Sequence, residues 1–118
     1  MTLPPGSTDT DLKRVEMLRE WKRWVKIIAA EAKKILPDTK VYVVGSIVRG
    51  DYTGGSDVDI IIVSDRVPEN ALRRAAIKAR IEDAINLPYY HPFEIHLLRP
   101  EEAQHYLKKN KIVVEAND

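Results

Sequence analysis

The sequence predicts an α+β fold in which helices flank a small mixed β-sheet of about three to four strands. Two observations predict it. Apolar residues recur every three or four positions over residues 10–35 and 69–86, as in amphipathic helices. Short runs over residues 40–44, 57–63 and 93–98 are rich in Val and Ile and are typical of strands. We expect the helices mainly on one face of the sheet and a functional site at the other face or at an edge. The pattern does not give the strand order.

Length and composition indicate one globular domain. Of the 118 residues, we expect residues 1–9 to form a flexible lead-in and residues 10–118 to form the folded unit. The net charge of +1 gives no support for an RNA partner, which remains an option. The lack of cysteine excludes disulfides and thiolate metal sites. Because no apolar run is long enough to span a bilayer, we expect a cytoplasmic protein without a membrane partner.

The first predicted helix begins at a capping residue among residues 8–10 and runs without interruption to Ile35, before Pro37. One face is apolar. Trp24, at the edge of that face, either packs in the core or anchors a protein partner. We interpret the basic residues of the opposite face as solvated, with a weak patch for an acidic acceptor or RNA as the alternative. These residues are Lys13, Arg14, Arg19, Lys22, Arg23 and Lys26.

The first two strands, residues 40–44 and 57–63, are joined by a short helical turn over Ser46–Gly50 and a glycine-containing loop. This connection is too short for a crossover helix, so we expect the two strands to be antiparallel.

The helix over residues 69–86 should bury Leu72 and expose Arg73 and Arg74. After the third strand, a last helix begins at Pro100, which two acidic residues follow, as is favoured at helix starts. Residues 112–114 are apolar and form a small strand, a docked tail or part of a partner surface.

The stretch from Val41 to Val63 carries the chemistry of the chain. Asp57 and Asp59 are two residues apart, so on a strand both would project from one face. Two adjacent carboxylates repel unless a cation neutralises them, and magnesium takes carboxylate oxygens. Gly45 permits close approach of a ligand to the backbone, and exposed amides at the following turn suit phosphate. The stretch therefore predicts a phosphate cradle facing a metal site.

A third acid, Glu94, lies on the third strand among apolar neighbours. If that strand lies beside the second, Glu94 can join Asp57 and Asp59, and three carboxylates can hold two magnesium ions. Otherwise Glu94 is a rim carboxylate bonded to an arginine. His96 should share the face of Glu94, where it acts as a general base, binds an acceptor or is structural.

The motif Gly45-Ser46-x-x-Arg49-Gly50, followed after five residues by Ser56-Asp57-x-Asp59, resembles the signature of the DNA polymerase β-type nucleotidyltransferase superfamily, in its minimal nucleotidyltransferase branch. The resemblance implies the polymerase β-like fold and makes Asp57, Asp59 and Glu94 both catalytic residues and magnesium ligands. The superfamily more often has aspartate at the third position. The resemblance also implies that Gly45 and Ser46 bind the triphosphate. Arg49 either binds the same phosphates or holds the loop through an acid. Ser56 is a further candidate phosphate-binding residue, for which we favour orientation of the Asp57 backbone.

The implied activity is magnesium-dependent transfer of a nucleoside monophosphate onto a protein or RNA acceptor. We expect the transferred group to be AMP and its donor to be ATP. Minimal domains of this type resemble antitoxins whose partner is a helical HEPN-type toxin. The alternative is a nucleotide-binding module that neutralises a partner without turnover. Phosphoryl transfer is disfavoured because the lysine-bearing phosphate loop is missing. A homo-oligomer is compatible with the small size and apolar helix edges.

Overall fold

The structure, a computed structural model, describes residues 5–115. Its sheet has the strand order β3–β2–β1–β4, in which β1 is antiparallel to β2 and β4 and β2 is parallel to β3. The strands are β1 (Lys40–Val44), β2 (Val58–Val63), β3 (Phe93–Leu98) and β4 (Ile112–Val114). The predicted α+β fold with a small mixed sheet is confirmed, as is the antiparallel first pair. Residues 112–114, for which three alternatives were open, form a strand.

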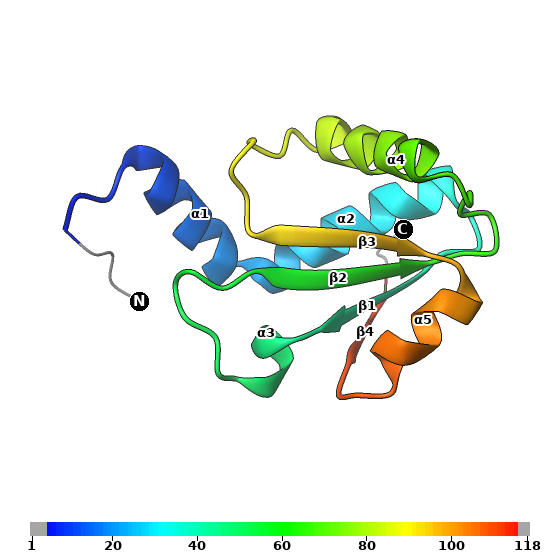
Figure 1. The fold of residues 1–118 in the computed structure, drawn as a ribbon. Helices are drawn as coiled ribbons and strands as arrows, with labels where there is room; N and C mark the ends of the chain where they lie inside the picture. Colours follow the sequence, from blue (N-terminus) through cyan, green and yellow to red (C-terminus); the bar gives the residue numbers. More distant parts are fainter. Residues whose placement is uncertain (1–4, 116–118) are drawn as a thin grey trace.

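Helices cover both faces of the sheet (Figure 1). They are α1 (Asp9–Arg19), α2 (Trp21–Ile35), α3 (Ser46–Arg49), α4 (Ala71–Ala84) and α5 (Pro100–Leu107). Alternation along β2 divides its side chains between the two faces. Val58, Ile60 and Ile62 join the main core with residues of α2 and α4, whereas Ile61 and Val63 pack with Ala103 of α5. Asp59 shares the face of Ile61, so it lies on the side of α5, away from the main core.

The first helix is interrupted, contrary to the prediction of one helix to Ile35. α1 ends at Arg19 and α2 begins at Trp21, because Glu20 has φ −99° and ψ 27°, outside helical geometry. Neither Gly nor Pro marks this break in the sequence. Its effect is visible in Figure 1, where α1 continues past the end of the sheet near the start of β2. The break therefore gives α1 a direction of its own and brings it to the loop before β2.

Three side chains test the predicted faces of the helices. Trp24 packs against the main core with its ring centroid 6.3 Å from that of Phe93, which confirms core packing. Leu72 is 81% exposed, contrary to prediction, because it lies on the face of α4 opposite the buried Ile81. Arg74 was predicted to face solvent. Instead it lies part-buried between α4 and α5 and donates to both carboxylate oxygens of Glu102, at 3.1 and 2.8 Å.

The start of α1 is fixed by a capping box. The Thr8 hydroxyl accepts from the Asp11 amide at 3.2 Å, and the Asp11 carboxylate accepts from the Thr8 amide at 2.9 Å. Residues 1–4 of the predicted lead-in lie outside the described residues. Between residues 5 and 115, none of the helices has the length and apolar character required to cross a bilayer.

Candidate active site

The parallel pairing of β2 with β3 brings together two of the predicted acids. The register places Asp59 opposite Glu94 and Ile61 opposite His96. Directly opposed residues of adjacent strands project from the same face, and so do residues two apart on one strand. Asp59, Glu94 and His96 therefore share the face on which α5 lies. The condition on which the role of Glu94 depended, a third strand beside the second, is met.

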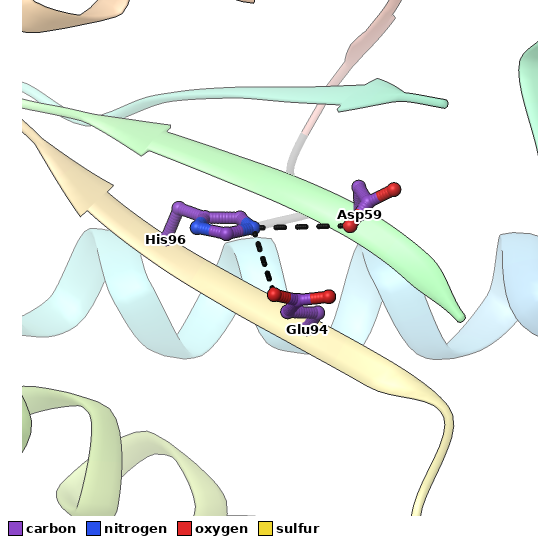
Figure 2. Close-up of side chains that lie close together, drawn as sticks. All are labelled: Asp59, Glu94 and His96. Atoms are coloured by element: carbon purple, nitrogen blue, oxygen red, sulfur yellow. Dashed lines mark ion pairs between the residues drawn. The ribbon is translucent and has the colours of Figure 1, made fainter. Parts of the chain in front are cut away.

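The three side chains form a compact polar group, shown in Figure 2. His96 Nε2 lies 3.6 Å from Glu94 Oε1 and 3.8 Å from Asp59 Oδ1. One ligand atom from each residue falls within 4.8 Å of the other two. The side chains of His96 and Asp59 are 28% and 32% exposed, and that of Glu94 is 52% exposed. The group is thus accessible to a small ion while its strand positions fix its geometry.

The electrostatics of this group disfavour a negative charge on Asp59. Burial, followed by the neighbouring charge of Glu94, raises the pKa of the Asp59 carboxyl above its ordinary value. His96 acts in the opposite direction, and the charge of Asp57 adds a further small increase to this pKa. Two carboxylates held together in this way are stabilised when a cation binds between them.

Gly45, at the end of β1, allows the approach of Asp59 to the backbone. It has a φ of +88°, which side chains other than hydrogen disfavour. A Cβ at this position would lie well inside van der Waals contact of Asp59 Oδ2. Only glycine therefore leaves room for the Asp59 carboxylate at its present position. Glycine is required here both by the positive φ of the turn and by this close contact.

The other predicted residues surround this centre. Ser46 is the first residue of α3 and is partly buried. Arg49 Nε donates to Asp51 Oδ2 at 3.3 Å, and Arg49 also lines the cleft beside this centre, so both predicted roles of Arg49 stay predictions. Ser56 Oγ accepts from the Thr53 amide at 2.9 Å, so the hydroxyl closes the loop. This contact is made to Thr53 and not to the Asp57 backbone, so the role of Ser56 in orienting Asp57 stays a prediction.

Arg14 occupies a position that sequence reasoning missed. It was interpreted as solvated, but its side chain is only 7% exposed. Nη2 donates to Asp57 Oδ1 at 2.7 Å and to the Ser56 carbonyl at 2.9 Å, and Nη1 donates to the Gly54 carbonyl at 3.1 Å. Its guanidinium also lies 5.5 Å from the ring centroid of Tyr90. Arg14 thus joins α1 to the loop that carries Asp57.

Asp57 differs in environment from Asp59. β2 begins at Val58, one residue later than predicted, so Asp57 lies just outside the strand. Its side chain is 55% exposed and bonded to Arg14. Only Asp59 and Glu94 belong, with His96, to the compact group within the described residues. Asp57 lies next to that group, near enough for its charge to act on Asp59.

A cleft of about 760 Å³ opens beside the group. Its volume is in the range of small-molecule sites. The residues that line it come from β1, α3, β2, β3 and the C-terminal part of the chain. They include Gly45, Arg49, Asp59, Glu94 and His96, together with His105, Tyr106, Lys109 and Asn110. The last four were not predicted as site residues, because nothing in the sequence indicates that α5 packs over this face.

Residues 25–116 match the family model of the nucleotidyltransferase domain. The chain belongs to the nucleotidyltransferase domain family. It is therefore a transferase, and the family implies a nucleoside triphosphate substrate and a divalent metal ion. The match begins at Val25, so Arg14 and the rest of α1 precede the matched region.

Two solved structures resemble this nucleotidyltransferase over most of their length. One is a candidate nucleotidyltransferase from Sulfolobus solfataricus, with 25% identity, a TM-score of 0.57 and coverage of 93% of this chain and 90% of the other. The second, also a candidate nucleotidyltransferase, has 29% identity, a TM-score of 0.58 and coverage of 83% and 97%. A comparison with curated proteins finds no significant match.

Proposed function

We propose that this nucleotidyltransferase moves a nucleoside monophosphate, AMP from ATP, onto an oxygen of a protein or RNA acceptor with the help of magnesium. The observation that carries the proposal is the juxtaposition of Asp59 and Glu94 beside Gly45 at the cleft. The family implies a triphosphate and a divalent metal. These residues supply hard oxygen ligands and an open backbone at one place.

The residues present fit a divalent cation. Carboxylate oxygens are the ligands that magnesium prefers, and burial, followed by the neighbouring charge of Glu94, raises the pKa of Asp59, an effect that a bound cation would offset. Asp57, Asp59 and Glu94 would hold the metal. The resemblance to the superfamily implies two metal ions at this site. The metal, when bound, would neutralise charge on the phosphates and on these carboxylates.

The chain's own residues then position the substrate. Gly45 and Ser46 would bind the β- and γ-phosphates through backbone amides and a hydroxyl, and Arg49, which lines the cleft, would add positive charge. The acceptor oxygen attacks the α-phosphorus, the new P–O bond replaces the bond to the β-phosphate oxygen, and pyrophosphate leaves. The acceptor proton passes to a base or to solvent.

The labelling of an acceptor tests this function. The protein is incubated with ATP carrying the label on the α- or the γ-phosphate, in a lysate of the source organism with magnesium. Transfer of the α-label alone, lost in Asp59→Asn, supports nucleotidyl transfer. Asp83→Asn, an exposed acid on α4, is the matched control and should label normally. Transfer of the γ-label would contradict the proposal.

We further propose a protein partner, a helical HEPN-type toxin that this domain modifies as an antitoxin. The small size of the domain and its exposed apolar residues support a partner: on β4, Ile112 is 38% exposed and Val113 57% exposed. The same observation favours the second candidate, a module that neutralises its partner by binding. The Asp59→Asn variant distinguishes the two candidates. It should abolish neutralisation that depends on modification of the partner and leave neutralisation by binding intact.

A further inference from the structure

His96 has a position that the nucleotidyl-transfer chemistry does not explain. Its Nε2 faces Glu94 Oε1 at 3.6 Å and Asp59 Oδ1 at 3.8 Å. Both separations exceed the usual length of a hydrogen bond to oxygen, about 2.7–3.2 Å. They suit a shared cation, because two metal–ligand bonds of about 2.1 Å allow ligand atoms to lie up to about 4.2 Å apart. Figure 2 shows the imidazole nitrogen directed between the two carboxylates.

The ring of His96 is held in this orientation from α5. Its centroid lies 5.8 Å from that of Tyr106, with an angle of 35° between the ring planes. The strand position of His96, opposite Ile61, fixes its backbone relative to Asp59. Backbone register and aromatic contact therefore place Nε2 where a third ligand would stand, before any ion arrives.

We propose that His96 Nε2 is a ligand of the divalent ion held by Asp59 and Glu94. Two carboxylates and an imidazole form a mixed oxygen and nitrogen set. Magnesium takes oxygen ligands, whereas imidazole suits first-row transition metals, whose affinities rise from Mn²⁺ towards Cu²⁺. The site should consequently bind Mn²⁺ and Co²⁺ more tightly than Mg²⁺. The inference rests on the proposed function only for the location of the metal and refines which ion the site holds best.

Pulsed electron paramagnetic resonance of Mn²⁺ added to the metal-free wild-type chain tests the ligation directly. Bound Mn²⁺ should show coupling to a nitrogen-14 nucleus of histidine. This coupling should disappear in His96→Phe, which retains an aromatic ring against Tyr106. It should persist in His105→Phe, the matched change at another histidine that lines the cleft. Bound Mn²⁺ without nitrogen coupling in the wild-type chain, or no bound Mn²⁺, would overturn the proposal, and neither result depends on how a variant folds.

Titration calorimetry gives the second readout. In His96→Phe the affinity for Mn²⁺ should fall about tenfold or more, while that for Mg²⁺ should change by less than about threefold. Equal losses for both ions would contradict a nitrogen ligand. These measurements need neither nucleotide nor acceptor. A wild-type chain that transfers the α-label but shows no nitrogen coupling would refute this inference alone, and a wild-type chain that shows nitrogen coupling without any label transfer would refute only the proposed function.

Discussion

Arg14 provides the sharpest test of how this site is assembled. The substitution is Arg14→Met, which keeps a long apolar stem in a buried position and removes the guanidinium. Three hydrogen bonds are lost, to the carbonyls of Gly54 and Ser56 and to the carboxylate of Asp57. We expect the loop that carries Asp57 to lose its attachment to α1 while the sheet stays intact.

The size of the effect follows from the exposure of the partners. A hydrogen bond to a charged group contributes about 1.5–3 kcal/mol to stability when its partner is left unpaired and buried. The Asp57 side chain is 55% exposed, so water replaces much of what Arg14 supplies. We therefore expect a loss of about 1–2 kcal/mol in the free energy of unfolding for the three bonds together. For a domain of this size that lowers Tm by roughly 3–8 °C.

Amide hydrogen exchange measures the loop itself. The Ser56 amide donates to the Thr53 carbonyl at 3.0 Å, within the segment that Arg14 holds. A loss of about 1.4 kcal/mol in local opening free energy speeds its exchange roughly tenfold. Nucleotidyl transfer should fall about 10- to 100-fold, because Asp57 is no longer positioned. Arg14→Lys should be intermediate, since an ammonium cannot reproduce the planar guanidinium.

The matched control is Lys13→Met, at the exposed neighbouring position of α1. It should leave the exchange of Ser56, the Tm and the transfer rate unchanged. Unchanged exchange and transfer in Arg14→Met would refute the positioning role. Tighter metal binding in Arg14→Met would also refute it, because Arg14 would then compete with the metal for Asp57 rather than hold Asp57 in place.

Three further predictions concern the same fold. Gly45→Ala should weaken metal binding about tenfold or more in calorimetry and lower stability by about 1–3 kcal/mol, because the backbone has a positive φ there and the added Cβ would clash with Asp59. The control Gly55→Ala, whose added Cβ would face open space, should change neither quantity. Asp59→Asn should abolish transfer yet raise stability at pH 7 by on the order of 1 kcal/mol in thermal melts. The Asp59 pKa is raised, so its ionisation costs stability as pH rises through that pKa, and the gain should vanish in acid where the carboxyl is protonated. Arg74→Met should lower the free energy of unfolding in urea by about 1–3 kcal/mol, because the Arg74 guanidinium donates to two carbonyls and to Glu102. Arg73→Met, at an exposed position, should lower it little.

Local patterns predicted most of the fold. The apolar runs predicted β1 and β3 to the residue, and the short connection predicted that β1 and β2 are antiparallel, because these features depend on neighbours in sequence. The break at Glu20 was not predictable in this way. Glutamate is a good helix former, and the bond that holds α1 in its new direction, from Arg14 to Gly54, joins residues forty positions apart, which local patterns do not reveal.

The same distinction between local and long-range features applies to the candidate site. Asp59, Glu94 and Gly45 were identified from motif and strand period, and the structure places them together. Arg14 was one of six basic residues at helical spacing, and nothing in their pattern distinguishes the one that is buried. The environment of Asp57 was equally hidden, because its bond to Arg14 joins residues that are 43 positions apart in the sequence.

The distribution of charge explains why the two aspartates of the motif are not equivalent. Asp57 receives a guanidinium at 2.7 Å, so its charge is compensated by the chain itself. Asp59 stands partly buried beside Glu94 with a histidine at 3.8 Å, and burial, followed by the charge of Glu94, raises the pKa of its carboxyl. Compensation of Asp57 by the fold concentrates the unbalanced charge on the Asp59–Glu94 pair. A divalent cation would complement that pair, and Arg14 would hold Asp57 next to it as a further ligand.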